Sequence, residues 1–345
     1  MKLLLISVKN AFPSGGIAVW TNRFLSQCTE RGIDCHLVNT EIIGKRHQTG
    51  KRCIWDELVR TLRIYRDLKK QLKSYDFDAV YLNTSCGNYG LFRDVWLGYL
   101  IHKKDIPLIT HYHCEIPYWV KCKTSVCTLG KLAAISRHNL VLCQNSQNFL
   151  QEHYNITASK VPNFVHSSLV RTTPKPIEGP IQHAIFVGNI TEHKGATELF
   201  AIAQQMPHIQ FTLIGQVNHT VSSWKTLDNL TLTGQLPHEQ VMQCLDEADV
   251  FLFPSHTEGC SMALMEAMAR GLPAIATDTG ANSEMLAHGG GIVVALHDVE
   301  AMVDALHQLD APSIRQTMSQ RAIQCIRQNY TDKNVDTLFN LIQLA

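Results

Sequence analysis

The chain has 345 residues, of which 45% are apolar and 18% charged, and its formal net charge is +1. This length and apolar content suit two globular domains, and no run of 18 or more apolar residues predicts a membrane-spanning helix. The eleven cysteines show no repeated C-x-x-C spacing, so we interpret them as reduced core residues of a cytosolic protein rather than as zinc ligands.

Charge is divided unevenly along the chain. Residues 1–160 contain 22 Lys and Arg against 12 Asp and Glu, and the remaining residues contain 9 against 18. A split of this kind indicates two domains that face different surroundings. The positive first half favours a phosphate-bearing partner, such as nucleic acid or anionic lipid.

The first half alternates short apolar runs with amphipathic stretches. The N-terminal run is short and is soon followed by Lys9 and Pro13, so it indicates a buried strand rather than a signal peptide. The predicted strands are 2–8, 34–39, 78–83, 107–112 and 139–143, and the predicted helices are 17–31, 54–74, 91–104 and 121–137. Unbroken apolar runs that alternate with helices predict a doubly wound parallel sheet.

The second half repeats this plan after a stretch rich in Ser, Thr, Pro and Gly. The predicted strands are 183–188, 209–214, 229–233, 249–253, 273–277 and 290–294, and the predicted helices are 194–206, 237–247, 261–270, 282–287, 298–309, 312–329 and 332–344. We therefore predict an α/β fold with two Rossmann-like, doubly wound domains that face each other across a cleft, with ligands at the carboxyl ends of the strands. The predicted parts are a domain at 1–165, a linker at 166–181, a domain at 182–330 and a C-terminal helix within 331–345.

The strongest functional signal lies between 249 and 269. A buried strand runs into a turn of small residues that opens a helix, and the backbone N–H groups of such a turn favour a phosphate. Glu258 lies on the loop, whereas Glu266 lies in the helix among Ala, Met and Leu. Because burying an unpaired carboxylate is costly, Glu266 either binds a ligand or belongs to a buried salt bridge or an interhelical hydrogen bond.

This stretch resembles glycosyltransferase family 4, whose members have the GT-B fold. The resemblance is strong over 183–294 and loose over 1–163, and it rests on Glu258-Gly259, Glu266, Gly271-Leu272-Pro273-Ala274-Ile275-Ala276, Gly280 and Glu284. It implies that Glu258 contacts the hydroxyls of the donor sugar and that Glu266 contacts the ribose. It further implies that the sugar and the phosphate are held by backbone groups of Gly259, Cys260 and Ser261.

The same resemblance gives roles to the parts of the chain. It implies that the first domain binds the acceptor and that the second binds the nucleotide sugar. It also implies that the C-terminal helix crosses back onto the first domain.

A second motif runs from 185 to 195, where Lys194 opens a helix. A cation at a helix N-terminus opposes the helix dipole, so Lys194 indicates a local anion unless it is a solvated surface lysine. The resemblance implies that Gly188 and Lys194 bind the donor diphosphate. Asn189 stands where the family has an arginine, which suggests looser diphosphate binding or help from another basic residue. By the same resemblance, the base is cradled by Gly215, Gln235 and Leu236.

In the first half, Ser14, Gly15 and Gly16 follow the first strand and precede a helix. Glycines let the backbone approach a phosphate closely, although a simple tight turn would use the same residues. The resemblance implies that this loop faces the diphosphate and the acceptor.

His111 and His113 come at the end of the predicted strand 107–112, on the same side of it. Two histidines at this spacing could bind a metal, but no third or fourth ligand is evident, so we predict no metal site. The resemblance implies that His113 meets the donor sugar near the reacting carbon. His111 is the second candidate, on the acceptor side with Ser14, or else a hydrogen-bonded core histidine.

Segment 44–73 predicts a basic amphipathic helix. Apolar residues recur every three to four positions among ten lysines and arginines, which include Lys45, Arg46, Lys51 and Arg52. The segment is either a surface helix packed on the sheet with a solvated basic face, or a helix that docks on an anionic membrane. Nucleic acid is disfavoured because no recognition module is evident.

The resemblance implies a retaining, metal-independent glycosyltransferase without a cofactor, in which His113, Glu258 and Lys194 are catalytic. The resemblance implies a nucleotide-diphosphate sugar as donor, with UDP favoured, and a glycan or lipid-linked acceptor in bacterial surface-polysaccharide synthesis. We expect a cytoplasmic protein with a peripheral contact to the anionic cytoplasmic face of the inner membrane. Two alternatives stay open, namely a nucleotide-sugar epimerase of the same fold and a catalytically silent binding partner of another transferase.

Overall fold

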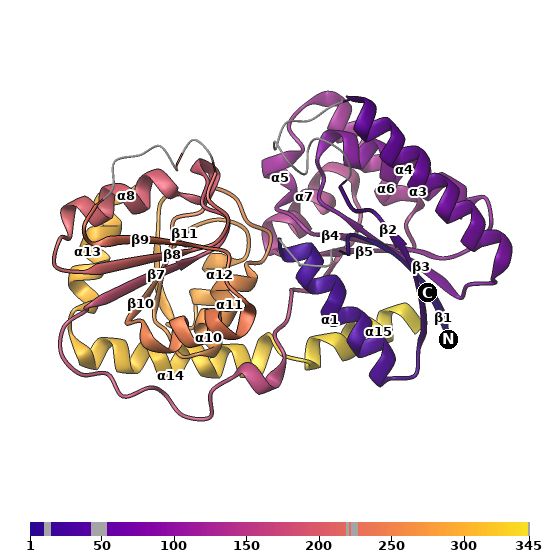
Figure 1. Ribbon diagram of the computed structural model, residues 1–345. Helices are drawn as coiled ribbons and strands as arrows, with labels where there is room; N and C mark the ends of the chain where they lie inside the picture. The colour runs from indigo at the N-terminus through magenta and orange to yellow at the C-terminus, as the bar shows by residue number, and fades with distance from the viewer. Residues whose placement is uncertain (10–14, 43–53, 219–220, 222–226, 344–345) are drawn as a thin grey trace. The chain divides into compact units, whose positions relative to one another are not determined.

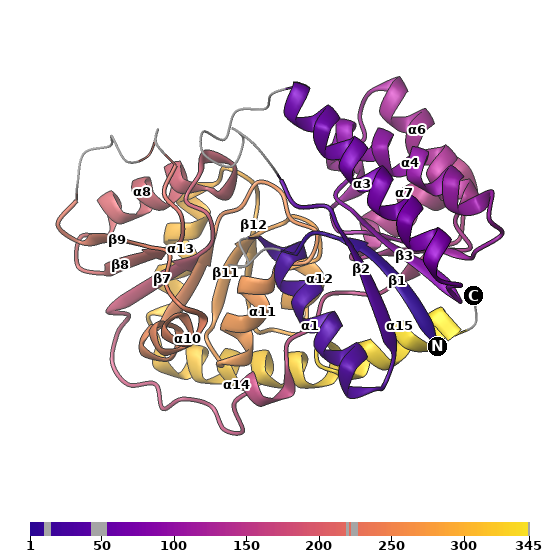
Figure 2. The same ribbon diagram turned by 45° about the vertical axis from the view of Figure 1, so that its right-hand side comes forward.

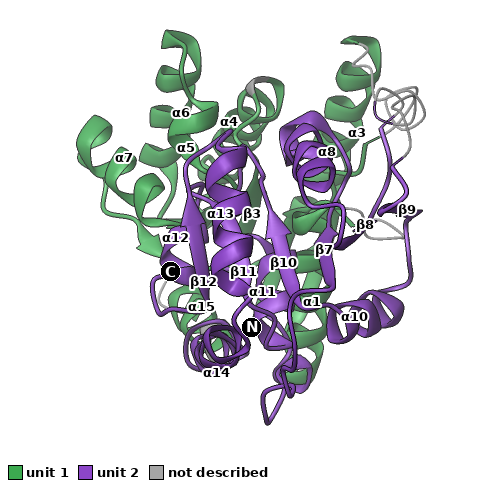
Figure 3. Cartoon of the chain, turned by 90° about the vertical axis from the view of Figure 1, so that its left-hand side faces the viewer, with its two compact units in different colours: residues 1–162, 335–345 green, residues 163–334 purple. Residues whose placement is uncertain are grey.

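The computed structural model describes residues 1–9, 15–42, 54–218, 221 and 227–343. The chain forms two compact units, which Figure 3 shows in green and purple. The first unit comprises Met1–Pro162 and Val335–Ala345, and the second comprises Asn163–Asn334. The stretch 166–181, which the sequence marks as a connection, is grouped with the second unit.

The first unit is built on a parallel six-stranded sheet with the strand order β2-β1-β3-β4-β5-β6. Its strands are β1 (Lys2–Ser7), β2 (Asp34–Asn39), β3 (Ala79–Thr84), β4 (Leu108–Tyr112), β5 (His138–Val141) and β6 (Ser159–Lys160). Its helices are α1 (Gly16–Glu30), α3 (Ile54–Ser74), α4 (Asn88–His102), α5 (Ile116–Trp119), α6 (Lys123–Ile135), α7 (Gln144–Tyr154) and α15 (Lys333–Gln343). Helices α1 and α15 cover one face of this sheet, and α3, α4 and α6 cover the other (Figures 1 and 2).

The second unit repeats the plan with the strand order β12-β11-β10-β7-β8-β9, again all parallel. Its strands are β7 (His183–Val187), β8 (Gln210–Ile214), β9 (Leu230–Gly234), β10 (Val250–Phe253), β11 (Ala274–Thr277) and β12 (Gly291–Val294). Its helices are η1 (Ser167–Leu169), η2 (Glu192–Lys194), α8 (Ala196–Gln205), α10 (His238–Glu247), α11 (Met262–Ala269), α12 (Asn282–Leu286), α13 (Val299–Leu309) and α14 (Pro312–Asn329). Helices α8 and α13 lie on one face, and α10, α11 and α14 lie on the other (Figure 1).

The apolar runs of the sequence form the two cores. Leu3–Ile6 of β1 and Val250–Phe253 of β10 are almost completely buried, as strands covered on both faces should be. The predicted pair of doubly wound parallel sheets is therefore confirmed. The prediction missed α5, α7 and β6, because α7 is rich in Gln and Asn and has few apolar residues, and the other two elements are very short.

Each sheet has one place where the order of its strands reverses. In the first sheet, β2 lies on one side of β1 and β3 on the other, and in the second sheet β8 and β10 flank β7 in the same way. The loops that leave the carboxyl ends of the two strands at such a place turn toward opposite faces of the sheet. Open α/β sheets bind their ligands there. The loops after β1, β3, β7 and β10 are therefore the first places to look for function.

Glycines let the loops after β7 and β8 touch each other. Gly188 has a φ of 155° and Gly215 a φ of 146°. A Cβ on Gly215 would lie 1.9 Å from the carbonyl oxygen of Gly188, which is part of the backbone and cannot swing aside. Any side chain at position 215 would therefore push the two loops apart.

We expect Gly215→Ala to lower the free energy of unfolding by ~3 kcal/mol or more, through backbone strain and overlap with Gly188. Gly179 is the matched control, because its φ is 68° but no atom of the part of the chain that the structure describes lies within 4 Å of the place where a Cβ would stand. Gly179→Ala should therefore cost only ~1–2 kcal/mol. Urea unfolding of both variants measures the difference, and equal losses would disprove the close contact.

Candidate functional site

In the second unit, a lysine and a glutamate meet where the strand order reverses. Lys194 ends the short helix after β7, and Glu258 lies on the loop after β10. Lys194 Nζ is 2.5 Å from Glu258 Oε1 and 3.5 Å from the carbonyl oxygen of Thr257. The Glu258 side chain is 11% exposed and that of Lys194 31%, so the ion pair is partly shielded from water.

Two further glycines bring these loops together. Gly195 has a φ of 80°, and a Cβ there would lie 2.3 Å from the carbonyl oxygen of Pro254, so the turn that carries Lys194 packs directly on the loop after β10. Gly280 has a φ of 56°, and a Cβ there would lie 2.4 Å from the carbonyl oxygen of Glu258. The Ala281 N–H also donates to the carbonyl oxygen of Gly259, at 2.9 Å. Backbone contacts thus fix the Glu258 loop from both sides.

Glu266 lies on α11 and is 6% exposed. Its Oε1 is 3.0 Å from Nε2 of His238, at the start of α10, whose side chain is half exposed. An interhelical hydrogen bond was one of the two alternatives that the sequence analysis gave for Glu266, and the structure contains it. His238 was not predicted, because nothing in the sequence near it indicates a partner on another helix.

The loop between Glu258 and α11 ends in a helix cap. Ser261 Oγ accepts a hydrogen bond from the Leu264 N–H at 3.2 Å, which is the usual N-cap contact. Cys260 is buried, and its carbonyl oxygen accepts a hydrogen bond of 2.7 Å from Asn163 Nδ2. Together with Gly259, these residues start α11 beside Glu258, so a helix N-terminus lies at the ion pair. Such an end attracts anions.

The residues predicted to bind the base and the diphosphate lie at neighbouring strand ends. The Gly188 N–H donates to the carbonyl oxygen of Ile214, and the Gly215 N–H donates to that of Gly234, both at 2.9 Å. Asn189 and Gln235 are exposed and Leu236 is partly buried. The structure thus puts these positions at the carboxyl edge of the second sheet, and their roles stay predictions.

In the first unit, a polar network joins the ends of β1, β3 and β4. His113 Nε2 donates to Asn83 Oδ1 at 2.9 Å, and Asn83 Nδ2 donates to Ser7 Oγ at 2.8 Å. Ser7 Oγ lies 2.6 Å from Thr21 Oγ1 of α1. Burial, helped by the neighbouring His111, lowers the pKa of His113 well below 6.5, so the imidazole is neutral at pH 7. Sequence reasoning missed Asn83 and Ser7, which belong to no motif.

His111 is fully buried and has both ring nitrogens occupied. Nδ1 lies 2.8 Å from the Tyr81 hydroxyl, and Nε2 lies 3.1 Å from the carbonyl oxygen of Val161. The sequence analysis interpreted His111 either as an acceptor-side residue or as a hydrogen-bonded core histidine, and this arrangement agrees with the second interpretation. It presents no surface to an acceptor in this conformation, so any influence on a reaction would pass through His113, whose ring centroid is 4.1 Å away.

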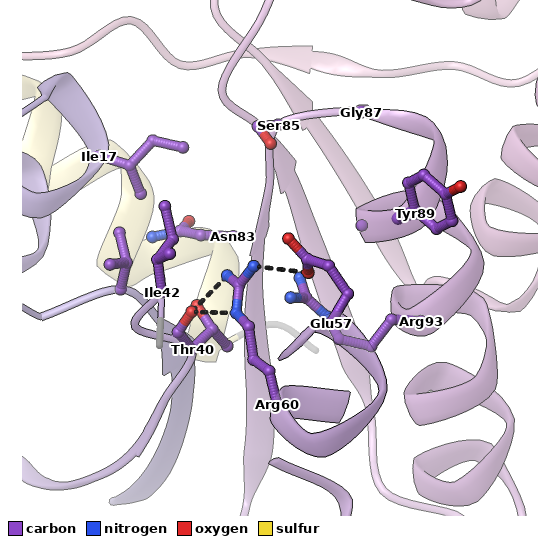
Figure 4. A pocket seen from close by; sticks show the side chains of 12 residues that line it. Ile17, Thr40, Ile42, Glu57, Arg60, Asn83, Ser85, Gly87, Tyr89 and Arg93 are labelled. Carbon is purple, nitrogen blue, oxygen red and sulfur yellow. Dashed lines mark hydrogen bonds and ion pairs between the residues drawn. The ribbon is translucent and has the colours of Figure 1, made fainter. Parts of the chain in front are cut away.

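A cavity of about 200 Å³ opens beside this network (Figure 4). Arg60 lies between the carbonyl oxygen of Thr40, which accepts from Nε at 3.0 Å, and Glu57, whose Oε2 is 3.1 Å from Nη1. Arg93 pairs with Asp94 at 2.6 Å. The lining residues include Ile17, Asn83, Ser85, Tyr89, Arg60 and Arg93. The cavity therefore contains two guanidinium groups, each paired with a neighbouring carboxylate, within a mixed polar and apolar wall.

The predicted glycine loop leads into this region. Gly15 has a φ of 99° and precedes α1, which starts at Gly16. Among the described residues, no atom lies within 4 Å of a Cβ built on Gly15. Ser14 lies outside the described residues.

The predicted basic helix is present as α3, but its apolar residues do not all face the sheet. Ile64 and Leu68 are buried, whereas Ile54, Trp55, Leu58 and Leu62 are 49–75% exposed. They line a groove of about 770 Å³ with Tyr89, Phe92, Trp96 and Tyr99 of α4. The exposed basic residues of the helix are Arg66, Lys69, Lys70 and Lys73. Lys45, Arg46, Lys51 and Arg52 lie outside the described residues.

Within the parts of the chain that the structure describes, none of the helices combines the length and the apolar character needed to traverse a bilayer.

Residues 175–324 match the family model described as glycosyl transferases group 1. The amylovoran biosynthesis glycosyltransferase AmsK of Erwinia amylovora is 34% identical over 140 residues, 36% of this chain and 34% of AmsK. The lipopolysaccharide core biosynthesis mannosyltransferase LpsB of Rhizobium meliloti is 33% identical over 102 residues, 29% of this chain and 28% of LpsB. The match thus spans about a third of the length of these curated relatives.

Solved structures match the whole chain. Sucrose-phosphate synthase from Thermosynechococcus elongatus aligns with a TM-score of 0.83 at 17% identity, over 99% of this chain and 98% of that chain. Anabaena Alr3699/HepE, crystallised with UDP and glucose, aligns with a TM-score of 0.75 at 14% identity over 100% of both chains. At these identities the likeness shows the fold alone, and the predicted GT-B fold is confirmed.

His111 should make the protein less stable in acid. Burial lowers its pKa from 6.5 to about 3, and the hydrogen bond to Val161 offsets only part of this shift. Between those pH values the unfolded chain binds a proton that the folded chain does not, so stability falls by up to ~1.4 kcal/mol per pH unit as pH decreases.

His111→Gln, which can still donate to Val161 but does not titrate, should reduce the stability difference between pH 7 and pH 5 by about 2 kcal/mol. Urea unfolding at the two pH values measures this difference. His208→Gln, at an exposed position, should leave it unchanged. If His111→Gln also leaves it unchanged, the imidazole is not buried as described.

Proposed function

We propose that this chain, whose residues 175–324 belong to the group 1 glycosyltransferase family, is a retaining transferase that uses a nucleotide-diphosphate sugar. The observation that carries the proposal is the ion pair of Lys194 and Glu258 beside the N-terminus of α11, where the strand order reverses. The sugar transferred is a hexose or an N-acetylhexosamine, and UDP is the favoured nucleotide. The complex of Alr3699/HepE with UDP and glucose, in a structure of the same fold, supports this preference.

The Lys194–Glu258 pair and the N-terminus of α11 can compensate the negative charge of the donor diphosphate. A diphosphate leaves readily once its negative charge is compensated, and Lys194 and the N-terminus of α11 offer positive charge and backbone donors at one place. When a donor binds, the ammonium group of Lys194 exchanges Glu258 for a phosphate oxygen, and the Glu258 carboxylate becomes available to the sugar hydroxyls. Because these groups neutralise the leaving group, we expect transfer without a divalent ion.

Glu266 is well placed for the nucleoside. Its carboxylate is nearly buried and oriented by His238, so it can accept hydrogen bonds from two vicinal hydroxyls such as those of ribose. Gly215, Gln235 and Leu236 lie at the adjoining edge of the sheet, where the base of the nucleotide would then bind.

The first unit offers a place for an amphipathic acceptor. Its cavity contains two guanidinium groups, which suit phosphate oxygens, and it shares Glu57, Tyr89 and Arg93 with the apolar groove of α3 and α4. A polar head and a hydrocarbon chain could therefore bind side by side. We propose a lipid-linked acceptor, taken from the anionic cytoplasmic face of the inner membrane.

The biosynthetic setting follows from the relatives. AmsK and LpsB are described by their roles in amylovoran and lipopolysaccharide core biosynthesis. We propose that this chain likewise acts in the synthesis of a bacterial surface polysaccharide.

Nucleotide binding tests the donor site. UDP at about 100 times its Kd should stabilise the protein by ~2.7 kcal/mol, which appears as a rise in Tm, and GDP, ADP and CMP should give smaller shifts. Adding Mg²⁺ should not enlarge the UDP shift. Glu266→Gln, which preserves size, should abolish it, whereas the exposed Glu300→Gln should keep it. No shift with any nucleotide would refute the donor site.

An assay with radiolabelled donor and membrane lipid extract separates this function from its rivals. Radiolabel should move to lipid in the wild type and not in Glu258→Gln. Conversion of the donor sugar without an acceptor would indicate an epimerase. If the wild-type protein binds UDP but is as inactive as Glu258→Gln, the chain is a catalytically silent partner of another transferase.

Vesicle flotation tests the acceptor surface. We expect the protein to float with vesicles that contain anionic phospholipid, less so at high salt. Phe92 is 73% exposed, and Phe92→Ser should weaken binding about tenfold or more because a buried aromatic contributes ~1.5–3 kcal/mol. Leu296→Ser, at an exposed apolar position of the second unit, should bind normally. Equal flotation of both variants would rule out the groove.

A further inference from the structure

Three side chains that the proposed reaction does not use converge in the second unit. They are Glu198 of α8, His256 of the loop after β10 and His297 of the loop after β12. Glu198 Oε1 lies 2.7 Å from His256 Nε2 and 2.9 Å from His297 Nδ1, and the two rings lie edge to face with centroids 4.2 Å apart. We propose that these side chains form a binding site for a divalent transition-metal ion, and that Zn²⁺ is the ion that fits best.

The carboxylate of Glu198 has an unsatisfied oxygen. The residue is 7% exposed, and its Oε2 is buried without a hydrogen-bond partner among the described residues. Leaving a buried carboxylate oxygen unpaired is costly, and native proteins rarely do so without a reason. Both imidazoles contact Oε1, so the hydrogen bonds of the cluster leave Oε2 unsatisfied. A cation at the cluster would interact with both oxygens.

The hydrogen bonds of the cluster already point its ligand atoms at one another. A metal ion would replace the two hydrogen bonds to Glu198 Oε1 with bonds to the nitrogen lone pairs of His256 and His297, once each imidazole carries its proton on the other ring nitrogen.

The ligand set selects the kind of ion. Two imidazole nitrogens and one carboxylate are a common set for zinc, and they leave a fourth position for water. Mg²⁺ prefers oxygen ligands in an octahedron and is disfavoured here. The three ligand atoms lie within 4.8 Å of one another, and tetrahedral coordination needs spacings of about 3.4 Å. The widest spacing between ligand atoms would shrink by up to ~1.4 Å, and the His297 side chain, 63% exposed, has room to move.

Such an ion would connect the segments that carry the proposed donor site. Glu198 lies on the helix that begins just after Lys194 and Gly195, and His256 lies two residues before Glu258. Metal binding would therefore hold the Lys194 turn and the Glu258 loop together at the carboxyl edge of the sheet. This consequence rests on the proposed function, whereas the metal site itself does not.

Calorimetric titration of the full, untagged chain with Zn²⁺ tests the site. We expect one tight site per chain in the wild type. His297→Ala and Glu198→Gln should each raise its Kd by more than the roughly 10–100-fold that is usual for loss of an outer-sphere partner. Since His297 is exposed, its replacement should leave the fold intact, which the Tm without metal would verify. The control is His208→Ala, which removes an exposed histidine that is not one of the three ligands.

The proposal fails if no stoichiometric site is found, if both variants bind Zn²⁺ like the wild type, or if Mg²⁺ binds equally well. The proposed donor site can fail independently. Glu266→Gln retains all three metal ligands, so its zinc titration should match that of the wild type whatever happens to its UDP shift. Zinc binding without any nucleotide shift would support the metal site and refute the donor site.

Discussion

The reversal of strand order in each sheet is the constraint on which the rest of the structure depends. Parallel strands need crossover helices, and a crossover that changes face leaves two neighbouring strand ends whose loops turn away from each other. In the first unit these ends bring Ser7 beside Asn83, which also binds His113 from the end of β4, and in the second unit they bring together Lys194 and Glu258. Neither group is adjacent in sequence, and in both cases the topology of the sheet decides which polar side chains meet.

The loops at these strand ends are held by backbone contacts rather than by long side chains. The contacts of Gly188 with Gly215, of Gly195 with Pro254 and of Gly280 with Glu258 all lie closer than a Cβ would allow. Rigid turns of this kind fix the ion pair before any ligand arrives. Less of the binding energy is then spent on ordering the loops, which is the advantage of a preorganised site.

Local patterns in the sequence identified the strands, the helices that follow them and the carboxylate on the loop after β10, because each is a property of adjacent residues. The partners were not predicted. His238 joins Glu266 across two helices, and Asn83 joins His113 across two strands, so neither appears as a motif. Alternation put His111 and His113 on the same side of β4, but only the packing shows that His111 is fully buried while His113 is partly exposed. The α3–α4 groove was equally hidden, since a stripe of apolar residues gives the same pattern whether it is covered or exposed.

Three carboxylates of the second unit follow one electrostatic rule. Glu258 is paired with Lys194, Glu266 with His238, and Glu198 with His256 and His297, and all three carboxylate side chains are largely shielded from water. Each partner can also exchange the carboxylate for a ligand, since an ammonium group can bind a phosphate and an imidazole can bind a metal ion or water. The carboxylate then binds the ligand in place of its partner, so no charged group is left buried without a favourable contact. Buried acids that are paired in this way can be rigid in the empty protein and still be ready to bind.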